Sequence, residues 1–146
     1  MCDREDPESE QSAMTPRQLG DSIGTVYCEG LSELSGLLGA QADPAALSEE
    51  VAALKERLIE RLIPLGHARA ALEPDERQAV DMATSFAVSR VDMAAFQAMT
   101  DACTTYRQSH NALSNMLASF NVIHQYAAFE LLAQQLPDEA SRLGVG

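Results

Sequence analysis

The chain has 146 residues, of which 46% are hydrophobic and only 5% aromatic, and 22 acidic against 10 basic residues give it a net charge of −12. This length suits one domain with a core of its own, and a composition rich in Ala and Leu favours helices over strands. The charge argues against binding to nucleic acid or to anionic lipid, because there is no basic patch to replace their counterions.

Residues 1–13 form an acidic leader, which we expect to be disordered because it has almost nothing to bury. Cys2 stands directly before the acidic part of this leader, and the arrangement looks like a processed bacterial lipoprotein with Met in place of its signal peptide. Cys2 is therefore the candidate lipidation site, and a lipid there would be the chain's one link to a membrane. The alternative is a cytosolic protein whose second residue happens to be Cys.

The first helix is expected to begin at Thr15 and Pro16 and to end near Leu38, since Thr is a good cap and Pro suits the first turn. Gly20 and Gly24 lie four residues apart in it and predict a close helix crossing. We interpret this as a contact within one bundle, with a dimer contact as the alternative.

The second helix is expected to begin at Asp43 and Pro44 and to kink or end at Pro64 and Gly66. A third helix begins at Pro74. From Asp75 to Leu136 the chain then has no Gly and no Pro, and one straight helix of that length would measure about 93 Å. A compact domain requires a break, either at 89–92 or at 109–111, and we favour the second.

Apolar residues in this stretch recur at steps of about four and three, which predicts one buried helical face. Met82, Phe86, Met93 and Phe96 begin this stripe. The expected last helix, 111–135, lies largely within a segment that has no charged residue from Gln108 to Phe129.

The polar side chains of this last segment are neutral amides, hydroxyls and imidazoles. Such a face is either packed on several sides within the bundle or meets a partner or a ligand, since charge is depleted at interface cores. The candidate binding residues are Tyr106, His110, Asn111, Ser114, Asn115, Asn121, His124 and Gln125.

The chain shows no catalytic, metal-binding or cofactor-binding motif, and we predict neither an enzyme nor a cofactor. Cys28 and Cys103 are candidates for a disulfide if the protein is exported. His110 and His124 are fourteen residues apart, so they cannot share a metal along one continuous helix.

These patterns predict an all-α protein: a four-helix up-down bundle over 14–146, preceded by the leader. The expected function is binding to another protein, as a small lipid-anchored protein of the bacterial envelope or periplasm, of the accessory or immunity type. The alternatives are an acidic cytosolic adaptor that forms a homodimer similar to a secretion chaperone, and a bundle that holds a small ligand.

Overall fold

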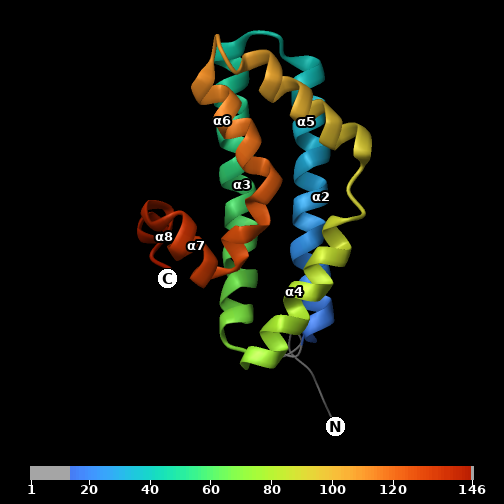
Figure 1. The fold of residues 1–146 in the computed structure, drawn as a ribbon, viewed down its shortest axis with the longest axis vertical. Helices are drawn as coiled ribbons and strands as arrows, with labels where there is room; N and C mark the ends of the chain where they lie inside the picture. Colours follow the sequence, from blue (N-terminus) through green and yellow to red (C-terminus); the bar gives the residue numbers. More distant parts are fainter. Residues whose placement is uncertain (1–13, 146) are drawn as a thin grey trace.

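The computed structural model describes residues 14–145, which form seven α-helices, one 3₁₀ helix and no strand. The prediction of an all-α fold is confirmed, but the described chain has seven helices where four were expected. The leader and Cys2 lie outside the described residues. The helices are α2 (Pro16–Ala40), α3 (Pro44–Ala70), α4 (Pro74–Val88), α5 (Met93–Tyr106), α6 (Asn111–Ser119), η1 (Phe120–Ala127), α7 (Phe129–Gln135) and α8 (Pro137–Leu143) (Figure 1).

The two long helices begin at the predicted caps. The Thr15 hydroxyl accepts a hydrogen bond from the Gln18 backbone N–H, and the Gln18 side chain accepts one from the Thr15 N–H. The Asp43 carboxylate caps α3 by accepting a hydrogen bond from the Ala46 backbone N–H.

Pro64 does not end α3, which continues to Ala70. A proline removes one backbone hydrogen bond, and the packing along α3 outweighs that loss.

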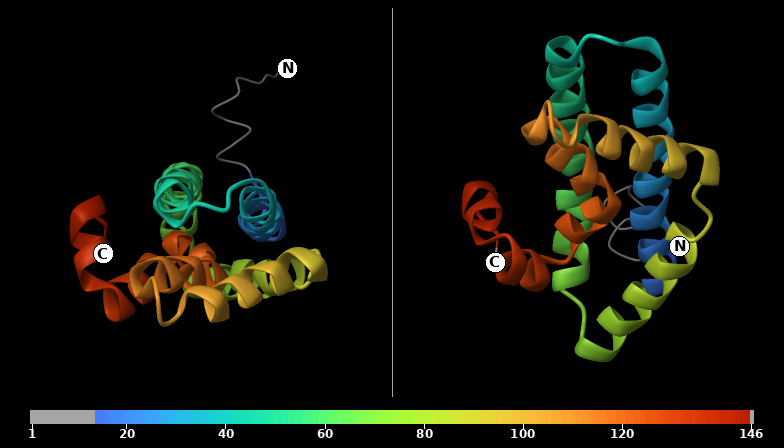
Figure 2. Two further views of the ribbon diagram at one scale, coloured as in Figure 1. Left: turned by 90° about the horizontal axis from the view of Figure 1, so that it is seen from above. Right: turned by 45° about the horizontal axis from the view of Figure 1, so that its top comes forward.

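The helices form two layers (Figure 2). In one layer α2 and α3 lie side by side; in the other are α4, α5, α6 and η1. In the second layer, α4 packs mainly on α2, whereas η1 packs mainly on α3. Buried leucines of α2 and α3 belong to one hydrophobic core, including Leu31, Leu34, Leu54, Leu58 and Leu62.

Both proposed breaks are present. The preferred one is confirmed, because α5 ends at Tyr106 and α6 begins at Asn111. The other occurs as well: α4 ends at Val88, and the Asp92 carboxylate caps α5 by accepting a hydrogen bond from the Ala94 N–H.

The prediction of a single last helix over 111–135 is wrong, because α6 is followed there by the 3₁₀ helix η1. Phe120, Ile123 and Tyr126 are all buried, and they are spaced by three residues. A 3₁₀ helix has three residues per turn, so within a turn this spacing repeats one face, as it does for Ile123 and Tyr126. The backbone is not helical at Val122 (φ −126°, ψ 22°), which separates Phe120 from the other two.

The prediction that the apolar stripe is buried is also wrong for its first residues. Met82, Phe86 and Met93 are exposed, whereas Val80, Thr84 and Ala87 are buried against α2. The close approach of α4 to the glycines of α2 leaves room only for small side chains, so the large ones face outward.

Candidate functional site

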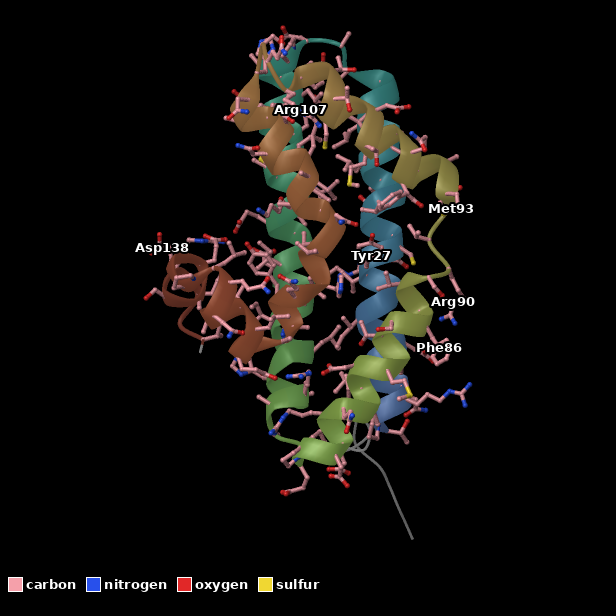
Figure 3. All side chains as sticks on the ribbon, viewed as in Figure 1. Tyr27, Phe86, Arg90, Met93, Arg107 and Asp138 are labelled. Carbon is pink, nitrogen blue, oxygen red and sulfur yellow. The ribbon has the colours of Figure 1, made fainter. Side chains whose placement is uncertain are left out.

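The most exposed large apolar side chains of the described residues lie on α4 and at the start of α5. The exposed fractions are 60% for Met82, 67% for Phe86 and 67% for Met93. Figure 3 shows Phe86 and Met93 on the side of the second layer that faces away from α3. We call these three residues the apolar ridge.

Met82 and Phe86 line both a groove and a shallow hollow, one on each side of α4. The groove, of about 480 Å³, lies between α2 and α4; the hollow, of about 570 Å³, follows the other side of α4. The groove is lined by Arg17, Asp21, Ala79, Met82, Ala83, Phe86 and Arg90, and the hollow by Gln78, Asp81, Met82, Ser85, Phe86 and Ser89.

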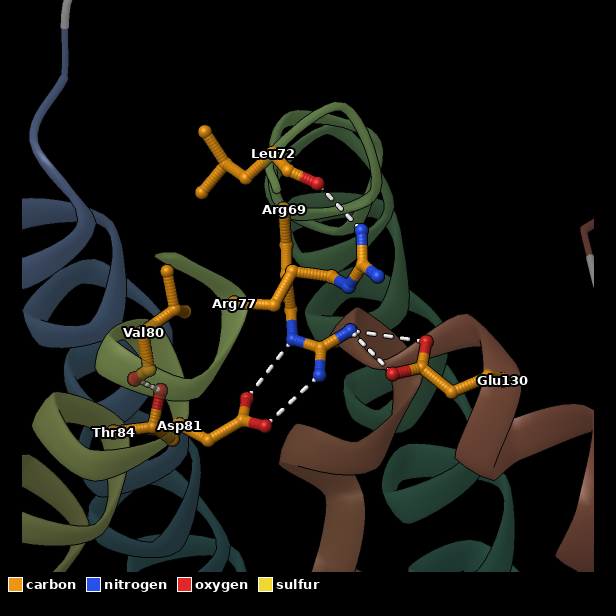
Figure 4. A network of polar contacts seen from close by, with 7 residues as sticks. All are labelled: Arg69, Leu72, Arg77, Val80, Asp81, Thr84 and Glu130. Carbon is orange, nitrogen blue, oxygen red and sulfur yellow. Dashed lines mark hydrogen bonds and ion pairs between the residues drawn. The ribbon is translucent and has the colours of Figure 1, made fainter. Parts of the chain in front are cut away.

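A separate cleft of about 420 Å³ opens between α4 and the η1–α7 segment. Its most organised feature is the buried guanidinium of Arg69, drawn in Figure 4. Arg69 donates to both carboxylate oxygens of Asp81, each at 2.9 Å, and its Nη1 lies 2.8 Å from Glu130 Oε2. Arginine is charged at any physiological pH, and hydrogen bonding to Asp81 raises the pKa of Arg69 further. The two ion pairs join α3 to α4 and α7.

His124 lines the same cleft and packs edge-on against Tyr27, with 5.2 Å between ring centroids. The His124 Nδ1 atom is buried without a hydrogen-bond partner in the described structure, and burial lowers the pKa of the imidazole. Beside it, the Tyr27 hydroxyl donates to Asn121 Oδ1 at 3.5 Å. Gln125 also lines this cleft.

Tyr106 and His110 form a second group at the turn between α5 and α6. Their rings meet edge-on at 5.8 Å between centroids, and His110 Nδ1 lies 2.9 Å from Ser109 Oγ. The lining of the cleft includes His124 and Gln125 but not Tyr106 or His110. The candidate residues therefore divide between two places on the molecule.

The remaining candidates lie on α6. Asn111 and Asn115 are exposed and hydrogen-bond to each other at 3.2 Å. Ser114 is buried and donates to the Cys103 carbonyl at 2.8 Å, which fastens α6 to α5. This serine therefore has a structural role rather than a place on an open surface.

Both described cysteines are free thiols, so the structure does not contain the Cys28–Cys103 disulfide considered from the sequence. The Cys28 thiol donates to the Ala87 carbonyl at 3.4 Å, and the Cys103 thiol donates to the Ser114 carbonyl at 3.7 Å. Burial raises the pKa of both thiols, which makes them poor nucleophiles.

Within residues 14–145, no helix combines the length and apolar character needed to cross a membrane. The same residues hold no group of three or more His, Cys, Asp or Glu side chains placed to bind a metal ion.

The apolar ridge was missed by our reading of the sequence, which placed its residues in the core. A signal was present: α4 carries small residues at Ala83 and Ala87 beside the large ones at Met82 and Phe86. Two adjacent apolar stripes on one helix indicate that one of them is not needed for the core.

Comparisons with protein-family models, curated proteins and solved structures give no match.

Proposed function

We propose that this protein is a non-enzymatic interaction module and that its partner protein binds the apolar ridge. The observation that supports this most directly is the exposure of Met82, Phe86 and Met93, each at 60% or more. Soluble proteins seldom expose neighbouring large apolar side chains unless another surface covers them. Methionines suit such a surface because their side chains adapt to the shape of the partner.

The neutral face of the last segment is a weaker choice for the main contact. Asn111, Asn115 and Asn121 are exposed there, and each amide would need a new hydrogen-bond partner once water is removed. Burying the apolar ridge carries no such cost and gains about 25 cal/mol for each Å² of apolar surface removed from water. The neutral face therefore fits the edge of an interface better than its centre.

The proposal predicts that replacing both Met82 and Phe86 by Ser removes partner binding and leaves the fold intact. The measurement is chemical cross-linking in the native source, followed by identification of the cross-linked protein. A matched control is Leu136→Ser, which changes another exposed apolar residue, 39% exposed, outside the ridge. Helical content and the midpoint of urea unfolding should be the same in both variants.

Loss of a defined cross-link in the double variant but not in the control supports the proposal. A cross-link that survives in the double variant contradicts it. Unfolding of the double variant would also contradict it, because the two side chains would then be part of the core.

A second candidate function is the binding of a small ligand in the cleft beside His124, whose volume lies in the range of ligand pockets. The variant Leu131→Trp should fill this cleft, which Leu131 lines. A compound that raises the unfolding temperature of the wild-type chain but not of this variant would favour ligand binding. No stabilising compound in a broad metabolite screen would argue against it.

We propose that the protein belongs to the bacterial envelope, attached through a lipid on Cys2, with the cytosolic adaptor as the alternative. This proposal is supported by Cys2 standing directly before an acidic leader in the sequence. Intact mass spectrometry of the protein from the membrane fraction of its native source tests it. A lipid adduct on Cys2 is the expected result, and an unmodified chain in the soluble fraction favours the adaptor.

A further inference from the structure

The groove between α2 and α4 points to a specific kind of partner. We propose that the partner presents an amphipathic helix whose apolar face covers the ridge and whose carboxylates pair with Arg17 and Arg90. This inference rests on the proposed function and adds the chemistry of the partner to it.

The shape of the groove suits a helix laid along α4. Its lining includes the small residues Ala79 and Ala83, while Met82 and Phe86 stand beside them as large, exposed apolar side chains. Grooves of this kind accept apolar side chains that recur at steps of three and four residues on one face of a bound helix. The volume of about 480 Å³ can hold several such side chains.

The charge of the groove differs from that of the whole chain. It is lined by two arginines and one acid, Asp21, although acids outnumber bases 22 to 10 in the sequence. Arg90 pairs with Asp21 at 3.8 Å, and the two side chains are 63% and 47% exposed. A long, exposed ion pair contributes little, so Arg90 can turn to a carboxylate of the partner at small cost.

A second copy of this chain fits the ridge less well. Three side chains exposed at 60–67% offer on the order of 400 Å², half of the roughly 800 Å² that each subunit of a standard interface buries. Two copies that each carry a net charge of −12 also repel each other. A short helix with a few carboxylates is repelled far less than a second copy of charge −12, so its local match with Arg17 and Arg90 can decide binding.

Two synthetic helical peptides with the same leucine face test the inference. One carries Glu at the positions flanking the leucines, and the other carries Lys at the same positions. Binding is measured by fluorescence anisotropy at low and at physiological salt. We expect the Glu peptide to bind about ten-fold more tightly than the Lys peptide, with the difference decreasing as salt is added.

Charge reversal in the protein provides the decisive comparison. The double variant Arg17→Glu and Arg90→Glu should prefer the Lys peptide, whereas Arg107→Glu, which changes an exposed arginine outside the groove lining, should keep the preference for Glu. Phe86→Ser should weaken the binding of both peptides by the same factor.

Three results would overturn the inference: equal binding of the two peptides, a preference of the wild-type chain for Lys, or no binding of either peptide. Each of these leaves the cross-linking result on Met82 and Phe86 unchanged, so the proposed function can stand when its partner chemistry fails. If the cross-link does not depend on Met82 and Phe86 while the Glu peptide still binds, the proposed function is contradicted and the chemistry inferred for the groove is supported.

Discussion

His124 has an unusual setting for a titratable residue. Its Nδ1 is the one buried side-chain nitrogen or oxygen among the described residues that lacks a hydrogen-bond partner. Tyr27 of α2 packs against the ring, and the same cleft is lined by Asp81 and Glu130 with Arg69 between them. Protonation would place a charge on a ring that is already poorly solvated, and the neighbouring carboxylates are occupied by Arg69.

The protein should therefore lose stability as the pH falls below about 6.5. Burial lowers the pKa of His124 from its ordinary value of 6.5, so the unfolded chain binds a proton more readily than the folded chain. Stability is present above the unfolded-state pKa and is lost as the pH falls toward the lower folded-state pKa. Urea unfolding between neutral and mildly acidic pH measures this loss.

His124→Gln should remove that part of the pH dependence, and the exposed His67→Gln should retain it. An identical pH slope in the wild-type chain and in the His124 variant would show that His124 is not the responsible group.

At the scale of elements, the crossing of α2 and α4 decides how the second layer is built. Gly20 and Gly24 are buried where α4 passes. A Cβ on Gly20 would lie 2.5 Å from the Val80 carbonyl oxygen, and one on Gly24 would overlap the Ala87 Cβ. The helices are in contact through backbone and small side chains, which is why the bulky residues of α4 point outward.

Gly24→Ala should therefore destabilise the fold by about 1–3 kcal/mol, because the added methyl group separates the two helices. Gly36→Ala is the matched control in the same helix, since a Cβ there meets nothing within 4 Å. The control should be stabilised by about 0.5–1 kcal/mol through higher helix propensity. Urea unfolding of both variants measures the difference, and equal effects would contradict the close crossing.

At the scale of the whole molecule, polar contacts join segments that are distant in the sequence. Arg69 of α3 pairs with Asp81 of α4 and with Glu130 of α7, so one side chain links both layers and α7. The end of the chain is fixed separately: Tyr126 donates to Glu139 at 2.7 Å, and Arg142 pairs with Glu56. The hydrogen bonds from Arg142 and Tyr126 lower the pKa of Glu139 to about 2.

Arg69→Ala should cost about 2–3 kcal/mol, since it removes charge-assisted hydrogen bonds and the packing of a buried side chain. The cost stays below that of a fully buried pair because Asp81 and Glu130 are 55% and 64% exposed and regain water. Arg57→Ala, which breaks an exposed pair with Glu33, should cost less than about 0.5 kcal/mol. Denaturant unfolding measures the loss of unfolding free energy in each variant. Equal losses would show that the ion pairs of Arg69 stabilise the fold no more than an exposed pair does.

Several features of the fold could be predicted from the sequence because they depend on nearby residues. The caps at Thr15 and Asp43, the start of α4 at Pro74 and the break before Asn111 all follow from local backbone chemistry. The all-α class follows from composition and periodicity in the same way.

Other features depended on which surfaces meet in three dimensions. The sequence showed that Met82 and Phe86 are apolar, but only the approach of α4 to Gly20 and Gly24 decided that they lie outside the core. Likewise, the 3₁₀ helix arises where Phe120, Ile123 and Tyr126 all turn toward the core.

The features of the candidate site also differ in whether the sequence alone could predict them. That the last segment lacks charge is visible in the sequence, whereas the contact of His124 with Tyr27 and the three-way pairing of Arg69 join residues far apart in the chain. The sequence by itself determined where helices begin, because a cap acts within three or four residues. Only the tertiary structure decided which apolar face is buried, because burial depends on the shape of the neighbouring helix and not on the hydrophobicity of the residue alone.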